Sequence, residues 1–315
     1  MITTDETASN IVEPFLVYEN HKFGYIDSTG RSISAVKYAM ARPFSGGLAA
    51  VFMEAVHGYF WGYIDIVGNI AIEAKYSFAG DFSEGLAVVE ISDRRGVINQ
   101  WGTFLDISQF DEIRKFSDGL AAVRKATQWG YISKDGILVV PPRFDGAWSF
   151  AEGLAHVQIE GRWSYIDKAG DFVMPGRFDG AFAFHEGLAP IKTEDKWGFI
   201  DKNGALVISA KFDGTNGGSF REGLAAVMLG DRWGYIDQKG DLIVNFKFDF
   251  AAPFSEGLAA VHSRGLAGYI DHYGRYVVQP EYGVATDFSR GIAVVSKGSA
   301  WYCIRRDGKV IWPSA

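Results

Sequence analysis

The chain has 315 residues, of which 48% are hydrophobic and 22% are charged, and its formal net charge is −7. This hydrophobic content is too high for a disordered chain, so we expect a folded protein. The negative charge offers no basic surface for the phosphates of nucleic acid or for anionic membranes, and it disfavours both as partners.

The number of cysteines and the first ten residues indicate the cellular compartment of the protein. Cys303 is the single cysteine, which excludes an internal disulfide and favours a reducing environment. The first ten residues have no basic segment followed by an apolar one, as a signal peptide would. No apolar run approaches the roughly 20 residues of a membrane helix. We therefore predict a cytoplasmic protein that does not enter the membrane.

An internal repeat of about 34 residues runs along the chain. One marker is a glycine after an aromatic position, and the other is the glycine of a Phe-x-x-Gly-Leu element. The first marker falls at Gly24, Gly62, Gly96, Gly130, Ser164, Gly198, Gly234, Gly268 and Tyr302. The second falls at Gly47, Gly85, Gly119, Gly153, Gly187, Gly223, Gly257 and Gly291. Both recur at steps of 34 residues, apart from one step of 38 and one of 36.

The two long steps locate two insertions. The first adds four residues near His57-Gly-Tyr-Phe60, because the two markers lie 15 residues apart in that repeat and 11 apart in the later ones. The second adds two residues within 214–218. Insertions gather in loops, where the backbone meets water, so we expect both at the surface.

Within each repeat the sequence predicts three short strands. In one repeat these are 120–123, 129–132 and 137–140, which are apolar, aromatic or β-branched and too short for helices. An Asp-x-x-Gly element joins the second strand to the third, as at Asp167 to Gly170, and its Asp and Gly favour a tight turn. A link of roughly ten residues leads to the next repeat. Each repeat is thus a three-stranded antiparallel meander.

The ends of the chain fit the same scheme. Residues 15–18 align with a first strand and 310–313 with a third, so nine whole repeats account for 13–315 as a single β-repeat domain, after a tail of residues 1–12. Such small sheets must stack on one another to build a core. We predict an all-β fold with propeller-like stacking. The alternative is an open β superhelix, because nine repeats exceed the roughly four to eight blades usual for propellers.

The repeated motif resembles that of the bacterial WG (or KWG) repeat family. Trp-Gly-Tyr-Ile begins at Trp61, Trp129 and Trp233, and Lys196 begins Lys-Trp-Gly-Phe-Ile-Asp; each is paired with an element close to Phe-Ser-Glu-Gly-Leu-Ala. The resemblance covers nearly the whole chain and implies a β-repeat array with no common activity. Departures from the motif include Phe23, Arg95, Ser164, Ala267 and Tyr302.

The repeat contains no recognisable catalytic constellation. Its acids, such as Asp167 in the turn and Glu152 before the glycine, recur because each repeat needs them for turns, whereas a catalytic pair needs two carboxylates in different environments. The six histidines show no ligand spacing for zinc, and one cysteine adds no thiolate cluster. We therefore predict no catalytic residue, no metal and no cofactor, and we expect most motif tryptophans in the core.

The variable positions lie between the first and second strands of each repeat and at the irregular repeats. Such hairpin tips on a rigid scaffold form the usual kind of binding edge. The candidate binding residues are His57, Tyr59, Phe60, Arg95, Lys125, Gln128, Arg162, Asp195, Asn216, Arg232 and Arg264.

The sequence therefore predicts a non-enzymatic scaffold that binds another protein through these hairpins or through a concave surface. The alternative is a propeller-type enzyme, or a protein that binds a glycan or small ligand, with its site at the repeat axis. It would need unpaired polar residues from non-equivalent positions of several repeats.

Overall fold

The computed structural model describes residues 13–174 and 178–313, and these residues form β-strands and turns without a helix. They build nine small antiparallel sheets. The chain divides into two compact units, of which unit 1 ends at Ile107 and unit 2 begins at Ser108. The predicted tail, residues 1–12, lies outside the described residues. The all-β repeat architecture is confirmed.

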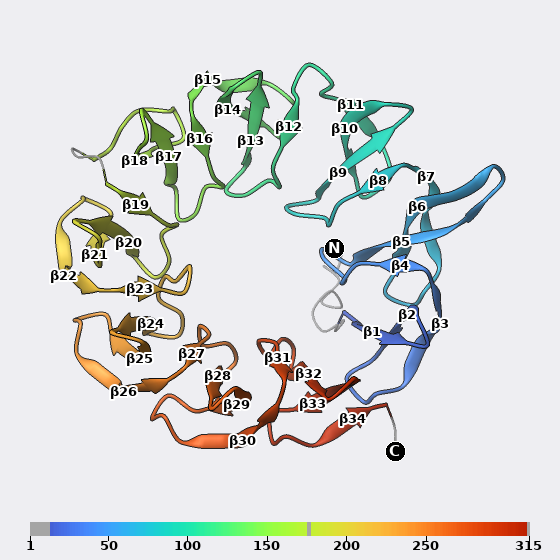
Figure 1. Cartoon of the computed structure of the whole chain (residues 1–315). Helices are drawn as coiled ribbons and strands as arrows, with labels where there is room; N and C mark the ends of the chain where they lie inside the picture. The colour runs from blue at the N-terminus through green and yellow to red at the C-terminus, as the bar shows by residue number, and fades with distance from the viewer. Residues whose placement is uncertain (1–12, 175–177, 314–315) are drawn as a thin grey trace, which may run out of the picture. The chain divides into compact units, whose positions relative to one another are not determined.

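Unit 1 contains three sheets, drawn in blue to cyan in Figure 1. Its strands are β1 (Phe15–Glu19), β2 (Lys22–Ile26), β3 (Ser32–Tyr38), β4 (Met40–Ala41), β5 (Leu48–Ala55), β6 (Gly58–Asp65), β7 (Ile70–Tyr76), β8 (Phe78–Ala79), β9 (Leu86–Ile91), β10 (Arg94–Asn99) and β11 (Phe104–Asp106).

Unit 2 contains six sheets that follow one another side by side (Figure 1). Its first twelve strands are β12 (Glu112–Ile113), β13 (Leu120–Lys125), β14 (Gln128–Ser133), β15 (Leu138–Phe144), β16 (Gly146–Ala147), β17 (Ala155–Ile159), β18 (Arg162–Ile166), β19 (Gly180–Ala181), β20 (Leu188–Thr193), β21 (Lys196–Asp201), β22 (Leu206–Phe212) and β23 (Gly214–Thr215). The others are β24 (Leu224–Leu229), β25 (Arg232–Asp237), β26 (Leu242–Phe248), β27 (Phe250–Ala251), β28 (Ala259–Ser263), β29 (Leu266–Ile270), β30 (Tyr276–Tyr282), β31 (Val284–Ala285), β32 (Ile292–Lys297), β33 (Ala300–Arg305) and β34 (Val310–Trp312).

The predicted three-stranded meander is present, and most sheets add a short fourth strand. In the sheet β12-β13-β14-β15, the two residues of β12 pair with Arg124 and Val123 of β13. This fourth strand comes from the link between repeats, which the sequence predicts as a simple crossover. The stacking of successive sheets is propeller-like, as predicted, with large aromatic side chains buried between them.

The turn acids have the structural role that their position predicts. Asp237 accepts hydrogen bonds from the backbone N–H groups of Lys239 and Asp241, both at 2.9 Å, and so closes the turn between β25 and β26. Asp167, Asp201 and Asp271 make the same pair of contacts in their own turns. These carboxylates are committed to the backbone and are poor candidates for chemistry.

The motif tyrosine, where a repeat has one, links its sheet to the next. Tyr131 donates its hydroxyl to the carbonyl oxygen of Trp148 at 2.8 Å, and Tyr235 donates to Ala252 at 2.6 Å. The two residues of each pair are 17 positions apart, so each bond joins neighbouring sheets. Burial raises the pKa of both phenols, which therefore stay protonated and act as donors. Val97, Phe199 and Cys303 occupy this position in three repeats and lack the hydroxyl.

We expect Tyr235→Phe to lower the free energy of unfolding by about 1 kcal/mol, because the Ala252 carbonyl loses its buried donor. Urea unfolding followed by tryptophan fluorescence measures the loss. The control is Phe199→Tyr, the reverse change at the same position of the neighbouring sheet, which should not lower the free energy of unfolding. An unchanged midpoint in Tyr235→Phe would mean that this bond does not hold the sheets together.

Candidate binding groove

The four-residue insertion of the second repeat lengthens one hairpin. Strands β5 and β6 have eight residues each, whereas β13 and β14 have six. The short strand β4 pairs with β5 no further than Phe52, and β7 pairs with β6 no further than Trp61. The distal part of the hairpin, 53–60, thus extends beyond its neighbouring strands (Figure 1). Its outer backbone edges have no strand beside them among the described residues.

A groove lies along one face of this hairpin, inside unit 1. It has a volume of about 720 Å³ and is bounded by the distal hairpin, by β7 and by the tip between β9 and β10. Met53 and Phe60 lie opposite each other on the hairpin and line the groove together with Ile70 and Ile91. The groove therefore has an apolar lining, which suits a buried apolar side chain.

The polar residues around the groove are mainly acidic. Glu73 and Asp93 line it, and Lys75 is the lysine among the lining residues. Glu54 also borders the groove, but it pairs with Tyr59, so its side chain lies on the opposite face of the hairpin. His57 contributes an imidazole at the tip of the hairpin. The carboxylates of Glu73 and Asp93 outnumber the one ammonium group of Lys75. The net negative charge of the lining favours a basic partner.

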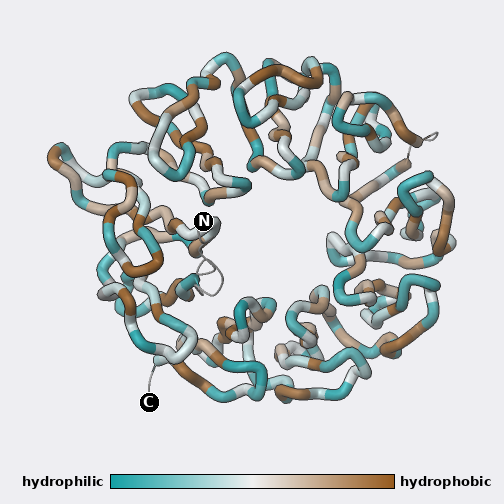
Figure 2. The backbone as a smooth tube through the Cα atoms, turned by 180° about the vertical axis from the view of Figure 1, so that it is seen from behind, coloured by the Kyte–Doolittle hydropathy of each residue, from teal (hydrophilic) through white to brown (hydrophobic). Residues whose placement is uncertain are grey.

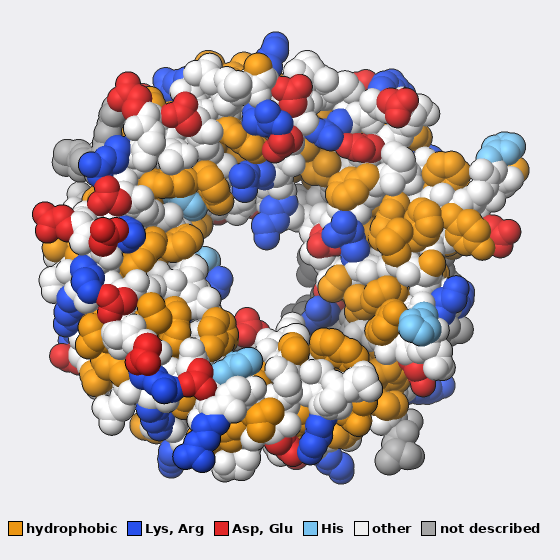
Figure 3. Space-filling model, viewed as in Figure 1, with side chains coloured by type: hydrophobic (Ala, Val, Ile, Leu, Met, Phe, Trp, Pro, Cys, Tyr) orange, Lys and Arg blue, Asp and Glu red, His pale blue; other side chains and the backbone are white. Residues whose placement is uncertain are grey.

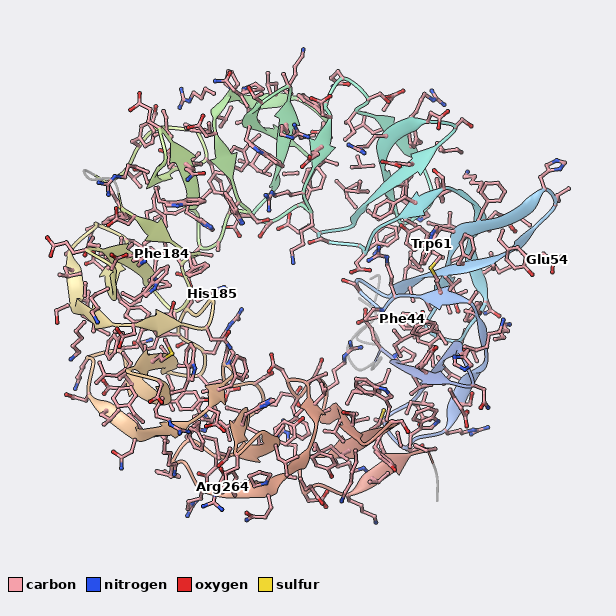
Figure 4. The ribbon with its side chains drawn as sticks, viewed as in Figure 1. Phe44, Glu54, Trp61, Phe184, His185 and Arg264 are labelled. Carbon is pink, nitrogen blue, oxygen red and sulfur yellow. The ribbon has the colours of Figure 1, made fainter. Side chains whose placement is uncertain are left out.

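The opposite face of the hairpin carries a second aromatic group. The ring of Phe52 lies 5.9 Å from that of Tyr59 and 5.6 Å from that of Trp61. Arg42 lies over Trp61, at 5.7 Å from the ring centroid. Hydrophobic side chains gather over β5 and β6 in Figure 3, and Figure 4 places Glu54 near the tip and Trp61 nearer the base.

Four of the predicted binding residues belong to this region. His57 and Phe60 line the groove, whereas Tyr59 is 59% exposed on the opposite face. Arg95 lies on β10 and donates two hydrogen bonds to Glu90, at 3.0 and 2.5 Å, so it braces the neighbouring hairpin. The sequence therefore predicted the irregular region correctly. It did not predict which residues of the hairpin face the groove and which face the opposite side.

Two predicted residues of unit 2 connect neighbouring sheets. Arg162 forms an ion pair with Asp179, and Arg232 forms one with Asp249. The other oxygen of each aspartate accepts a backbone N–H from a hairpin tip, at 3.1 Å from Glu194 and 3.3 Å from Gly265. These arginines therefore contribute to sheet stacking, although half of each side chain stays exposed.

The remaining predicted residues do not converge on one site. Lys125 and Gln128 are exposed and face each other at the tip of β13 and β14. Asp195 is exposed in the next-but-one hairpin and pairs with Lys192 at 2.9 Å. Arg264 is exposed at the tip of β28 and β29 and is labelled in Figure 4. Asn216 is half-buried and donates to the Ala251 carbonyl at 3.0 Å, so the second insertion supports packing.

The sequence-based predictions did not include several exposed apolar residues of unit 1. Val56 is 92% exposed at the tip of the long hairpin, which has a hydrophobic colour in Figure 2. Ile70 is 54% exposed at the groove, and Trp101 is 84% exposed in the turn between β10 and β11. For Val56 the sequence held a signal, because this apolar residue stands at a hairpin tip where other repeats carry residues such as Glu160 and Asp195.

The structure offers little for metal, thiol or membrane chemistry. In the residues it describes, no three His, Cys, Asp or Glu side chains gather in a metal-binding cluster. Cys303 is buried, and burial raises the pKa of its thiol to about 11, so it stays protonated at neutral pH. The described part of the chain has no helix long and apolar enough to cross a membrane.

These stacked sheets of three or four strands define a repeat protein with β-propeller-like blades. A model of the WG containing repeat matches residues 23–54, 61–94, 107–126, 129–163, 163–197, 197–233, 233–265 and 268–301. The chain therefore belongs to the WG-containing repeat family, which confirms the resemblance seen in the motifs.

Solved structures with similar folds share little sequence with this chain. A crystal structure of "the eukaryotic initiation factor" has a TM-score of 0.67 and 12% identity, over 95% of this chain and 94% of that one. Dihydro-heme d1 dehydrogenase NirN in complex with DHE has a TM-score of 0.50 and 13% identity, over 86% and 71%. Hsv2p of Kluyveromyces lactis has 0.47 and 10%, over 72% and 92%. These likenesses concern the fold alone. No curated protein matches the chain.

Proposed function

We propose that this protein is a non-enzymatic scaffold that binds an extended peptide segment of a protein partner in the groove of the long hairpin. The observation that carries the proposal is the insertion itself. It extends 53–60 beyond the neighbouring strands and places Met53 and Phe60 over a groove of about 720 Å³.

The free backbone edges favour recognition by strand addition. An extended peptide placed beside 53–55 or 58–60 would pair its N–H and C=O groups with those of the hairpin. Alternate side chains of a strand point to opposite faces, so every second residue of the peptide would face the groove. Such a site would select peptides in which apolar and polar residues alternate. The hairpin would not need to change its conformation to bind them.

The partner chemistry follows from the lining. Met53, Phe60 and Ile91 accept an apolar side chain, whereas Glu73 and Asp93 favour basic side chains at the rim. We therefore expect a peptide in which isoleucine and lysine alternate to bind, and the matched peptide with glutamate in place of lysine to bind more weakly. Higher salt should weaken the first interaction, because the rim charges are exposed.

We expect Phe60→Asp to weaken binding of the isoleucine–lysine peptide by about tenfold or more, because it places a charge in the apolar part of the groove. Fluorescence anisotropy of the labelled peptide measures the change. Leu229→Asp is the control, since Leu229 is 47% exposed at the end of an ordinary hairpin strand, β24, in unit 2.

Equal binding by wild type and Phe60→Asp would contradict the groove as the site. Absence of binding by any peptide of an alternating-sequence library, together with turnover of a small substrate by the purified protein, would contradict the scaffold role.

A further inference from the structure

Arg114 occupies an unusual environment in unit 2. It follows β12, and its guanidinium carbon lies 4.8 Å from the ring centroid of Trp129 and 4.6 Å from that of Trp148. The side chain is thus clamped between two indoles and remains partly exposed. No carboxylate within the described ranges forms an ion pair with it. Stacking on aromatic faces holds the planar fork in one orientation without occupying its hydrogen-bonding edge.

The chain contains an internal comparison for this site. Arg42 occupies the same place in the second repeat, five residues before the glycine of the Phe-x-x-Gly element, and lies between Trp61 at 5.7 Å and Phe78 at 5.5 Å. There the following sheet supplies a carboxylate, because Asp81 Oδ1 lies 3.9 Å from Arg42 Nη1.

The equivalent of Asp81 in the repeat that follows Arg114 is Ser149, four residues before Gly153. In both sites Nε of the arginine is buried without a hydrogen-bond partner. Both arginines lie over two aromatic rings, although the second ring is Phe78 beside Arg42 and Trp148, from a different position of the repeat, beside Arg114. The Arg114 site therefore has a comparable aromatic clamp but lacks the carboxylate.

Two groups that lie near Arg114, His156 and Tyr131, are uncharged, and Glu112 of β12 is paired with Arg124. His156 is buried, stacks on Trp148 with a centroid distance of 5.4 Å, and has no partner for Nδ1. Burial and the nearby charge of Arg114 lower the pKa of His156 to about 4, so the imidazole is neutral at physiological pH. The Tyr131 hydroxyl is protonated and donates to the Trp148 carbonyl. Neither of these two groups neutralises the guanidinium.

We propose that the Arg114 clamp is a binding site for a carboxylate ligand, whose carboxylate takes the place that Asp81 has beside Arg42. The guanidinium presents parallel N–H donors that match a carboxylate in a two-point contact. The partly exposed rings of Trp148 and Trp163, 4.7 Å apart, offer an aromatic surface next to it. A small aromatic acid fits both features, and benzoate is the simplest probe.

This site is independent of the long-hairpin groove. Its residues belong to the sheets of β12–β15 and β16–β18 in unit 2, whereas the groove lies in unit 1. Failure of either proposal leaves the other standing.

The experiment is a titration of the full chain with benzoate, acetate and inorganic phosphate, followed by the indole and arginine side-chain signals in NMR spectra. We expect benzoate to shift the Trp148 and Arg114 signals in a saturable way and to bind more tightly than acetate, which lacks the ring. Phosphate tests whether any oxyanion suffices. Tighter binding of phosphate than of benzoate would overturn the assignment to a carboxylate.

Two variants use the internal comparison. Ser149→Asp installs the counterpart of Asp81, and we expect it to weaken benzoate binding by about tenfold or more, because an internal carboxylate competes for Arg114. Asp81→Ser removes the carboxylate beside Arg42 and should add a second binding event, seen at the Trp61 signal. Arg114→Gln should abolish the first event. Equal benzoate shifts in wild type, Ser149→Asp and Arg114→Gln would overturn the proposal.

Discussion

Gly130→Ala is expected to destabilise unit 2 by about 3 kcal/mol, because the added methyl group collides with backbone rather than with a movable side chain. A Cβ at Gly130 would lie 2.3 Å from the carbonyl oxygen of Val140 and 2.7 Å from the nitrogen of Pro142. Both atoms belong to β15, which pairs with β14 on either side of the glycine through Trp129 and Tyr131. Strand β15 would have to move away from β14. The irregular pairing between Trp129 and Tyr131, which brings β15 close to Gly130, would then be lost.

The control lies in the neighbouring sheet, where the chain already carries a side chain at this position. Ser164 is buried there, and in the described part of the third segment bridges join Trp163 to Phe178 and Ile166 to Phe172. Ser164→Gly should therefore change stability by less than about 1 kcal/mol. Urea unfolding with circular dichroism compares the two. A loss in Gly130→Ala no larger than in Ser164→Gly would show that the close approach is not required.

The same position explains why the fold could be predicted from sequence. The glycine that recurs in most repeats marks a place where two strands approach closely, as at Gly62, Gly130 and Gly198, where an added Cβ would lie within 3 Å of the third strand. The Asp-x-x-Gly element marks a turn whose carboxylate binds its own backbone. Such local requirements repeat in most sheets and leave a signal in the sequence. Hence β1 and β34, the first and last strands, begin at the predicted residues Phe15 and Val310.

The fourth strand and the groove could not be predicted in this way. The two residues of β12 become a strand only because β13 lies beside them, and two residues have no periodicity of their own. The groove depends on which face of the long hairpin meets the next sheet. The sequence therefore identified His57 and Phe60 through the insertion but not Met53, Ile70 or Ile91, which come from ordinary strand positions.

The glutamates that precede the glycine of the Phe-x-x-Gly element, such as Glu256, are expected to contribute strongly to stability. Glu256 has a positive φ of 55° and accepts a hydrogen bond from the backbone N–H of Gly291, in the next repeat, at 2.7 Å. The N–H of Arg290 also donates to it, and Arg306 Nη2 lies 3.2 Å from Oε2. One carboxylate thus joins its own turn to two segments of the following sheet.

Glu256→Ala is expected to lower the free energy of unfolding by about 2 kcal/mol at neutral pH, because two backbone N–H groups and one guanidinium lose a charged acceptor. Glu194→Ala is the control, since Glu194 has a similar φ of 49° and lies exposed at a hairpin tip. It should leave stability nearly unchanged.

The pH dependence of this loss in stability distinguishes the contribution of the Glu256 carboxylate charge from that of side-chain packing. Desolvation acts to raise the pKa of Glu256, but hydrogen bonds from Gly291, Arg306 and Arg290 outweigh it, so the pKa lies below its usual value of 4.5. A carboxyl group with a lower pKa in the folded state stabilises the fold above the unfolded pKa, and this contribution is lost as pH falls through the folded value. The difference between wild type and Glu256→Ala should therefore be constant above about pH 5 and shrink in acid. A difference that persists unchanged in acid, measured by urea unfolding at each pH, would assign the effect to packing and not to the carboxylate.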